Sequence, residues 1–276
     1  MRMRFTGAML LVVCWVLLAS LPAQAKTNWV AADTNGLWFP VGEELVYKGY
    51  WGLLSVGEAR LWTEWVEEDG RRLLAIKFVA QSSRVISTVF AVNDNLESIV
   101  DPETFLPVRF TQRIREGKKV RDDAIVFDHK AGTATCKTVR ADKERAPKTV
   151  EIEADTRDVL SFMYFMRSGG IKVGTTNTCR ILFDAKMYSV TVAGREHEDV
   201  YLSHFGEVRC LELEPKAMFG EVFVRKGSLN MWISDDERCI CTKAMAIVPV
   251  ANVKMILQSV KGPGDDFWTS GKRKRK

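Results

Sequence analysis

Hydrophobic and polar residues alternate with a period of two along most of this chain. Such alternation is typical of β-strands that bury one face. Glycine, proline and aspartate residues separate the runs, and Asp69-Gly70 between two apolar runs favours a tight hairpin turn. The pattern predicts strands over residues 43–51, 55–66, 72–82, 95–100, 106–116, 120–129, 132–139, 180–186, 187–195, 201–205, 208–214, 229–234, 240–248 and 253–260.

One segment follows a helical period instead. Between residues 156 and 168 apolar side chains recur at spacings of three and four, and Gly169-Gly170 ends the run. Thr156 is the expected cap, and Asp158 falls in the first turn, where a negative charge is favourable. The apolar face is wide, so we expect this helix to be covered on most sides.

These elements indicate a mainly β protein. Their short connections favour antiparallel pairing, and a flat sheet of about a dozen strands would expose apolar surface and open edges. We therefore expect a large antiparallel sheet, curved into an incomplete barrel around one central helix. The charged stretch at residues 142–148 is expected to be a linker or an exposed loop.

The N-terminus has the three parts of a secretory signal. Arginines at positions 2 and 4 precede an apolar run over residues 8–21, and Ala23-Gln24-Ala25 follows as a small-x-small cleavage site. The run is shorter than the ~20 residues that span a bilayer, so we expect cleavage near Ala25 rather than a membrane anchor. The mature chain is then expected in the periplasm or outside the cell.

Composition and charge refine this organisation. A chain of 276 residues, 46% hydrophobic and 27% charged, is typical of a globular protein and excludes a disordered or collagen-like one. The net charge of +5 includes the basic run Lys272–Lys276 and the two signal arginines, and subtracting these seven charges leaves −2. The folded part therefore has no general nucleic-acid footprint.

The chain is expected to divide into four parts. They are a signal peptide at residues 1–25, a flexible segment at 26–36, one β-rich domain at 37–261 and a disordered basic tail at 262–276. Each basic residue of such a tail adds on the order of 1 kcal/mol of attraction to an anionic membrane surface. That surface is the partner we expect for the tail, with a simple solvated tail as the alternative.

Five cysteines follow the signal, an odd number for an exported protein. The alternatives are up to two disulfides, buried thiols that act as small apolar side chains, and a metal or redox site. No Cys-x-x-Cys or second ligand motif supports a metal, so no metal or cofactor is expected. Structural roles, including disulfides, are expected for Cys136, Cys179, Cys210, Cys239 and Cys241.

Several motifs together resemble one bacterial family. They are FPVGEELVY at residues 39–47, WGLLSVGEA at 51–59, RDVLSFMYFMR at 157–167, GEVRC at 206–210, EP at 214–215 and LNMWISDD at 229–236. Over residues 37–261 the chain is thereby similar to the bacterial domain of unknown function 3108. The resemblance implies an exported, β-rich envelope protein with no assigned reaction, and its architecture is analogous to the incomplete barrels of lipid carriers. The family's usual Arg-x-Pro-Val after the double aspartate is replaced by Arg238-Cys239-Ile240-Cys241, so a different register is expected for the last strands.

Catalytic signals are weak in this sequence. No Gly-x-Ser-x-Gly nucleophile turn is present, and Asp235-Asp236-Glu237 lacks the spaced ligands of a calcium loop, so a turn is expected there. The groups considered for acid or base chemistry are His129, His197, His204, Glu43, Glu44 and Glu58. The three glutamates could form a carboxylate pair, but we favour salt-bridged or exposed positions in strands for them. We therefore assign no catalytic residue.

Aromatic residues are the candidate ligand-binding groups. They would line a concave apolar pocket between sheet and helix, the alternative being that they only fill the core. These residues are Tyr47, Tyr50, Trp51, Trp62, Trp65, Phe162, Tyr164 and Phe165. The leading hypothesis is a non-catalytic envelope protein that binds a lipid, another amphipathic ligand or a partner chain in the concavity. The alternatives are a hydrolase acting on an envelope polymer and a scaffold that pairs through an open sheet edge.

Overall fold

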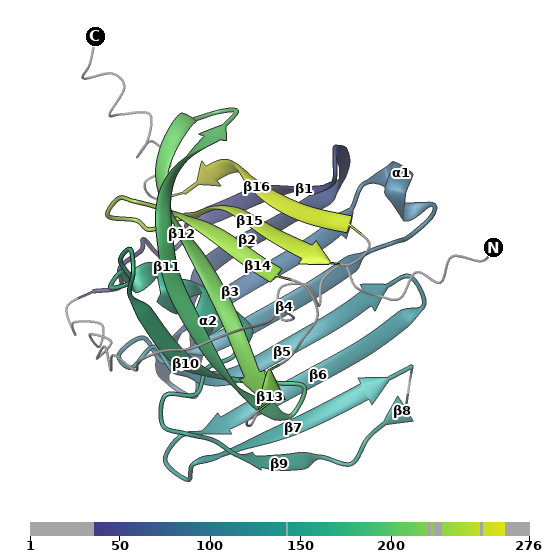
Figure 1. The fold of residues 1–276 in the computed structure, drawn as a ribbon. Coiled ribbons are helices and arrows are strands. Elements are labelled where there is room, and N and C mark those ends of the chain that lie inside the picture. The colour runs from purple at the N-terminus through teal and green to yellow at the C-terminus, as the bar shows by residue number, and fades with distance from the viewer. Residues whose placement is uncertain (1–35, 142, 220–221, 224–227, 249–250, 263–276) are drawn as a thin grey trace.

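The computed structural model describes residues 36–262 except 142, 220–221, 224–227 and 249–250, and its strands form one antiparallel sheet. The order across the sheet is β10-β11-β12-β14-β15-β16-β1-β2-β3-β4-β5-β6-β7-β8, with β13 beside β12 and β9 beside β7 (Figure 1). The strands are β1 (Glu44–Trp51), β2 (Leu54–Glu68), β3 (Arg71–Ser82), β4 (Asn93–Val100), β5 (Pro107–Glu116), β6 (Lys119–Asp128), β7 (Thr133–Arg140), β8 (Lys143–Glu144), β9 (Lys148–Glu151), β10 (Thr176–Phe183), β11 (Lys186–Leu202), β12 (Gly206–Phe219), β13 (Val222–Phe223), β14 (Ser228–Ser234), β15 (Cys241–Val248) and β16 (Ala251–Lys261).

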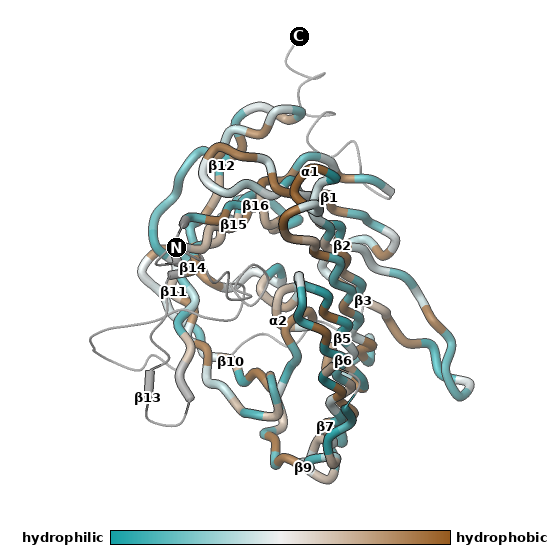
Figure 2. Tube along the Cα trace, turned by 90° about the vertical axis from the view of Figure 1, so that its right-hand side faces the viewer, coloured by the Kyte–Doolittle hydropathy of each residue, from teal (hydrophilic) through white to brown (hydrophobic). Residues whose placement is uncertain are grey.

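The sheet curves without closing. Its middle is formed by the first and last strands, because β16 pairs with β1, and the two halves bend towards each other from there. Seen from the side, the helix α2 (Val159–Phe165) lies in the hollow between them (Figure 2). The prediction of a mainly β, curved and incomplete barrel around a central helix is confirmed.

Local sequence explains the hairpin β2–β3. Asp69 and Gly70 both have positive φ, 51° and 71°, as the mirror-image turn of a two-residue hairpin requires. Further along the same pair of strands, a Cβ at Gly57 would lie 2.2 Å from the main-chain oxygen of Gln81. Only glycine therefore allows the close approach of the strands at that point.

The helix α2 begins later than the sequence predicts. Arg157 is still extended, since its N–H donates to Arg180 O and its carbonyl accepts from Leu182 N, each at 2.9 Å. Asp158 consequently becomes the N-cap, and its carboxylate accepts from the main-chain N–H groups of the helix's first turn. Thr156, the expected cap, is buried before the helix. Tertiary pairing with β10 sets this boundary. The short 3-10 helix η2 (Met166–Ser168) continues the chain to Gly169.

Three further elements differ from the predicted pattern. The helix α1 (Arg84–Ser87) was not predicted, because four residues are too few for a periodic signal. The strands expected at 187–195 and 201–205 are one strand, β11, with a register shift between Gly194 and His197. The stretch expected as a linker carries the short strand β8 and the start of β9, with residue 142 outside the described residues.

Candidate functional site

The concave side of the sheet holds an apolar cavity of about 120 Å³. Its walls come from β14, β15 and β16 on one side and from β1, β2 and β3 on the other, with Val92 just before β4. Met163 of α2 lines it from the helix side. Since β1 and β16 are neighbours, the cavity spans the place where the two halves of the sheet meet.

Small side chains on neighbouring strands create this space. Gly49 of β1 pairs with Gly57 of β2, and Gly57 pairs with Ser82 of β3. In the next row Ala59 of β2 pairs with Ala80 of β3. Paired residues on adjacent strands point to the same face of the sheet. These rows therefore put little side-chain volume on the concave surface, and a hollow remains.

Methionines supply the adaptable part of the wall. Met255 pairs with Gly49 across β16 and β1, and Ala244 of β15 pairs with both Met255 and Met231. Together with Met163 they surround the hollow with unbranched thioether side chains. Such side chains change shape at low cost, which suits a site that accepts more than one apolar shape.

Polar groups contribute little to the cavity wall. The Tyr47 hydroxyl donates to Cys241 O at 2.9 Å, so this polar group is already satisfied within the wall. Burial raises the pKa of Tyr47 well above its ordinary value, which keeps the phenol neutral. Ser82 also lines the cavity, whereas Glu58 and Gln81 pair between the Gly57–Ser82 and Ala59–Ala80 rows, so their exposed side chains point to the opposite face of the sheet.

A buried acid lies beside the cavity. Asp94 of β4 pairs with Ala80, so it continues the row of Ala59 and Ala80 on the concave face. Its side chain accepts from the Arg115 N–H at 2.7 Å, while its other oxygen is buried with no protein partner. Desolvation raises the pKa of Asp94 to about 6, and the nearby Glu116 carboxylate adds to this effect.

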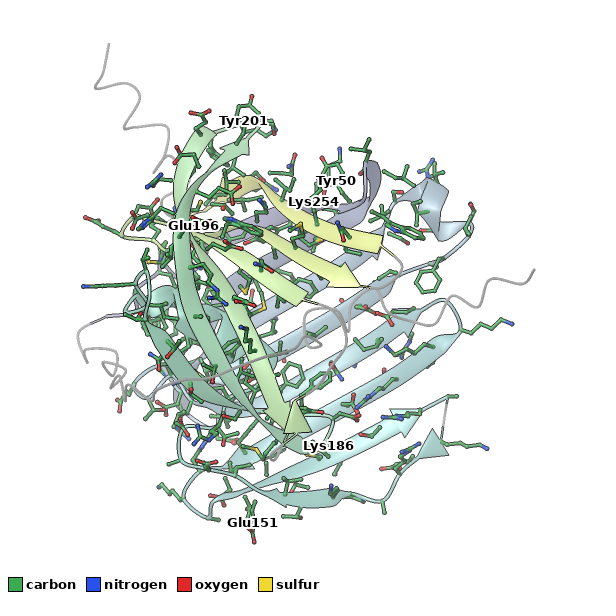
Figure 3. All side chains as sticks on the ribbon, in the orientation of Figure 1. Tyr50, Glu151, Lys186, Glu196, Tyr201 and Lys254 are labelled. Atoms are coloured by element: carbon green, nitrogen blue, oxygen red, sulfur yellow. The ribbon has the colours of Figure 1, made fainter. Side chains whose placement is uncertain are left out.

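The strand aromatics proposed from the sequence lie in several places. Tyr47 lines the cavity, and Trp51 is half-buried at the end of β1. Tyr50 lies near the ammonium groups of Lys48 and Lys254, at 5.9 and 5.8 Å from its ring centroid (Figure 3).

Two tryptophans of β2 contact arginines. The Arg60 guanidinium lies 5.9 Å from the centroid of the Trp62 ring. The Arg72 guanidinium lies 4.1 Å from the centroid of the Trp65 ring, whose residue is 39% exposed. Sequence patterns do not distinguish an aromatic residue that stacks on an arginine from one that lines a pocket.

The helix aromatics form a cluster with the N-terminal segment. Phe162, Tyr164 and Phe165 are all buried, and the Tyr164 ring packs edge-on against Phe39 with centroids 4.6 Å apart. The Arg157 guanidinium lies 3.8 Å from the centroid of the Phe165 ring. Met163, between these aromatics, is the helix residue that lines the cavity, and sequence reasoning did not single it out.

A buried ion triad anchors this cluster. Glu43 accepts hydrogen bonds from both Arg167 and Arg238, and all three residues are at most 7% exposed. Glu44, the next residue, instead pairs with Arg60 at 2.5 Å and Lys261 at 3.0 Å. The structure therefore separates the glutamates weighed as a carboxylate pair, because successive strand residues point to opposite faces.

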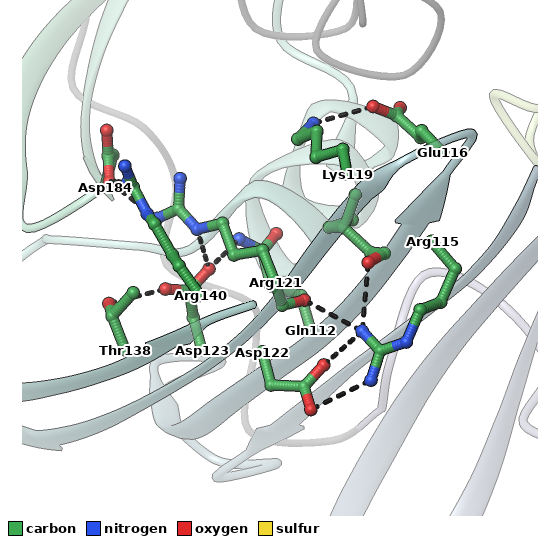
Figure 4. A network of polar contacts seen from close by, with 11 residues as sticks. Gln112, Arg115, Glu116, Lys119, Arg121, Asp122, Asp123, Thr138, Arg140 and Asp184 are labelled. Atoms are coloured by element: carbon green, nitrogen blue, oxygen red, sulfur yellow. Dashed lines mark hydrogen bonds and ion pairs between the residues drawn. The ribbon is translucent and has the colours of Figure 1, made fainter. Parts of the chain in front are cut away.

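A second polar network links β5, β6 and β7 to the β10–β11 turn (Figure 4). Gln112 and Arg121 each donate to Asp123 at 2.5 Å, and Arg121 also donates to Asp184 in that turn at 2.6 Å. Thr138 donates to the second Asp123 oxygen at 2.6 Å. The hollow beside them is only about 10 Å³, which is room for about one water molecule. We therefore interpret this network as stabilising the fold and not as a binding site.

Two of the three histidines contact neighbouring residues. His129 Nε2 lies 3.0 Å from Pro107 O and its ring stacks on Phe127. His197 Nε2 lies 3.2 Å from an Asp235 carboxylate oxygen, and His204 is exposed in the β11–β12 turn.

The acidic stretch after β14 forms a turn. An Asp236 carboxylate oxygen accepts from Ser234 Oγ at 2.9 Å and from Arg238 N at 3.0 Å. Among the described residues no group of three His, Cys, Asp or Glu side chains is placed to hold a metal ion.

The cysteines of the described residues are free thiols, and four of the five are buried. Burial raises the pKa of Cys179 and Cys241 to about 12 and that of Cys210 to about 11, so these thiols stay protonated. Cys136 and Cys239 have raised pKa values for the same reason. A disulfide among them remains a prediction for an oxidising compartment.

Comparison with known proteins gives a family and a fold. The model of the family described as "Protein of unknown function (DUF3108)" matches residues 46–258. A solved structure described as a beta-barrel-like protein of domain of unknown function DUF1849, from Brucella abortus, superimposes with a TM-score of 0.52 and 10% identity, over 80% of this chain and 97% of that one. At that identity the likeness shows the barrel-like fold alone.

Two further comparisons carry no functional argument. A candidate lipoprotein from Parabacteroides distasonis aligns with a TM-score of 0.35 and 9% identity, over 82% of this chain and 98% of that one. No curated protein matches the sequence.

Within the described residues, no helix has the length and apolarity needed to cross a bilayer.

Proposed function

The chain belongs to the DUF3108 family of proteins of unknown function, and on that premise we propose that it is an exported, non-catalytic binding protein for an apolar or amphipathic ligand. The ligand's apolar part would occupy the cavity between the curved sheet and α2. The observation that carries this proposal is the cavity itself, whose wall is built from small residues and methionines.

The stability cost of an unfilled cavity favours a ligand-binding site over a packing defect. An unfilled apolar space of about 120 Å³ costs on the order of 3 kcal/mol of stability. That is a large part of the 5–15 kcal/mol by which domains are typically stable. A single substitution of Ala59 or Ala80 by a larger apolar residue would fill much of the space, so the hollow is better explained by an occupant.

The size and polarity of the cavity restrict that occupant. Dry cavities of about 150 Å³ hold a benzene molecule, whereas drug-sized ligands need about 300–1,000 Å³. A segment of an acyl chain or one small ring therefore fits inside. A polar headgroup would remain outside the cavity, because Ser82 supplies a hydroxyl to the wall while the Tyr47 hydroxyl is already bonded to Cys241 O.

Filling the cavity tests the proposal. Ala59→Leu and Ala246→Leu add volume at two lining positions, and Ala131→Leu adds the same atoms at an exposed turn. We expect the two lining variants to bind a fluorescent fatty-acid analogue at least about tenfold more weakly. The added leucine occupies part of the cavity, so the ligand buries less apolar surface, by about the area of one side chain. Their thermal stability should be equal to or above that of the unmodified protein.

Native mass spectrometry before and after solvent extraction supplies the second readout. A small apolar molecule should co-purify with the unmodified protein and Ala131→Leu, and should be absent from the lining variants. Equal probe affinity in all four proteins would show that the cavity is not the binding site.

Export is part of the same proposal and rests on residues 1–25, which lie outside the described residues. Protein recovered from the cell envelope is expected to begin at Lys26, which intact-mass measurement checks directly. A chain that retains Met1 in the cytoplasm would contradict export.

A further inference from the structure

Four large hydrophobic side chains are exposed at one end of the central strands. Leu53 and Leu54, in and just after the β1–β2 turn, are 97% and 57% exposed, and Val85 and Val89, in and just after α1, are 76% and 78% exposed. We refer to these four residues as the apolar rim. Turn tips are usually polar, and single exposed apolar residues are common, but a group of four at one end of neighbouring strands is typical of an interaction site.

A main-chain hydrogen bond links the two segments that carry the rim. Ser83 N, the residue before α1, donates to Val56 O at 2.8 Å, two residues beyond Leu54. Figure 1 shows α1 beside the β1–β2 turn at the same corner of the molecule. The rim is thus a fixed feature of the folded sheet, formed by two short protrusions that lie next to each other.

Basic and aromatic residues lie near the rim. Tyr50, one strand position before the end of β1, lies near Lys254 (Figure 3) and also near Lys48, and Arg84 is the first residue of α1. Gly117 N donates to Ala91 O at 2.8 Å, which brings the exposed Lys118 to the same end of the strands. Against these four positive charges the exposed acid on the adjoining part of β2 is Glu58.

We propose that the apolar rim inserts into the surface of a lipid bilayer with anionic headgroups. Exposed leucines and valines would enter the acyl boundary, Tyr50 would lie at headgroup level, and Lys48, Arg84 and Lys254 would contact the phosphates. This combination of an apolar tip and a basic collar fits a bilayer surface. A protein partner would need a matching concave apolar surface bordered by acidic groups, whereas an anionic bilayer offers an apolar interior and negative charge at any point of its surface.

The rim also lies close to residues that line the cavity. Val56, Ser82 and Val92 line the cavity, and Val92 N donates to Ser82 Oγ at 2.9 Å. Val56 follows Leu54 by two positions, and Ser82 precedes Val85 by three. Docking at the rim would therefore bring the cavity mouth to the membrane, where an acyl chain could pass between the two. This last step rests on the proposed function, whereas docking itself does not.

Vesicle co-sedimentation of the full chain tests the docking. The test variant is Leu53→Glu/Val85→Glu, and the matched control is Val173→Glu/Tyr201→Glu, which changes two exposed apolar residues elsewhere, 50% and 70% exposed. On phosphatidylglycerol–phosphatidylcholine vesicles we expect the rim variant to bind at least about tenfold more weakly than the control, since each buried apolar side chain contributes about that factor or more. Equal binding of the two variants would overturn the proposal.

Two further measurements separate the rim from the basic tail and from self-association. Replacing Lys272–Lys276 by serine measures attraction through the C-terminal tail. If this change alone abolishes binding and the rim variant binds normally, docking through the rim is refuted. If the rim variant loses self-association in sedimentation velocity while vesicle binding is unchanged, the rim is an interface between copies of the chain and the proposal fails.

The fatty-acid probe separates this proposal from the proposed function. The rim variant changes exposed side chains outside the cavity lining. It should therefore keep its probe affinity and thermal midpoint while it loses vesicle binding. Loss of vesicle binding with no probe binding in any variant would support docking and refute the carrier function.

Discussion

At the scale of single residues, the least expected group is the buried carboxyl of Asp94. The strand predicted from the sequence begins at residue 95, so the pattern does not place Asp94 in a strand, whereas in the structure it is buried between the exposed Asn93 and Asn95. Pairing with Ala80 turns its side chain to the concave face, and only one of its oxygens has a protein hydrogen-bond donor. The result is a titratable group next to an apolar cavity.

Asp94 predicts a specific dependence of stability on pH. Its pKa is raised from 3.8 to about 6, so the folded protein holds this proton more tightly than the unfolded chain does. The contribution of this group to stability is complete below about pH 4 and is lost as the pH rises through about 6. We expect Asp94→Asn to raise the free energy of unfolding at pH 7.5 by about 1–3 kcal/mol and to flatten its pH dependence.

Urea unfolding at pH 4.5, 6 and 7.5 provides the measurement. Asp122→Asn is the matched control, because the Arg115 hydrogen bond lowers the pKa of Asp122. Stability from that pair is present at neutral pH and is lost as the pH falls through the lowered pKa, so the control should lose stability at pH 7.5. Equal responses of the two variants would contradict the assignment.

At the scale of elements, α2 is a short helix whose start depends on one side chain. Seven residues form a marginal helix without tertiary support. The Asp158 carboxylate accepts from Leu160 N at 2.8 Å and Ser161 N at 3.0 Å, and Ser98 Oγ of β4 donates to its second oxygen at 2.5 Å. One residue thus caps the helix and fixes it to the sheet.

Removal of this cap should be costly. We expect Asp158→Ala to lower the free energy of unfolding by about 2–4 kcal/mol, because it removes the cap and leaves the buried Ser98 hydroxyl without its acceptor. Ser83→Ala removes the corresponding N-cap of α1, which has no buried residue, and should cost less than about 1 kcal/mol. Chemical denaturation of both variants compares them, and equal losses would refute the tertiary role of Asp158.

At the scale of the whole molecule, distant segments meet at the Glu43–Arg167–Arg238 triad. Glu43 precedes β1, Arg167 follows α2, and Arg238 lies in the turn between β14 and β15. Two guanidinium groups around one carboxylate are tolerable inside a protein only while that carboxylate stays charged and bonded to both. The triad therefore joins the start of β1, the end of α2 and the β14–β15 turn.

Neutralising the central carboxylate tests this joint. Glu43→Gln should destabilise the protein by about 3–5 kcal/mol, because two buried positive charges lose their counterion. Glu44→Gln, one residue away, breaks more exposed pairs with Arg60 and Lys261 and should cost less than about 1 kcal/mol. Thermal and urea unfolding measure the stability of both variants. Similar losses of stability would show that the triad does not hold these segments together.

The alternation of side chains determined most strands of this fold. It is a local property, since one buried face imposes a period of two whatever the strand's partner. The Asp69-Gly70 turn and the existence of α2 also followed from neighbouring residues, through the backbone angles and the spacing that those residues favour. Recognition of the family motifs rested on the same local segments.

Only the tertiary structure decided the site and the exact limits of the elements. Arg157 is extended because β10 pairs with it, which no local pattern encodes. The cavity exists because registers on adjacent strands align Gly49, Gly57 and Ser82, which are separated in sequence by up to 33 positions. Sequence reasoning favoured large aromatics as pocket walls, whereas open space requires that small residues coincide. Such coincidence is a property of strand pairing, so it becomes visible only once the sheet has formed.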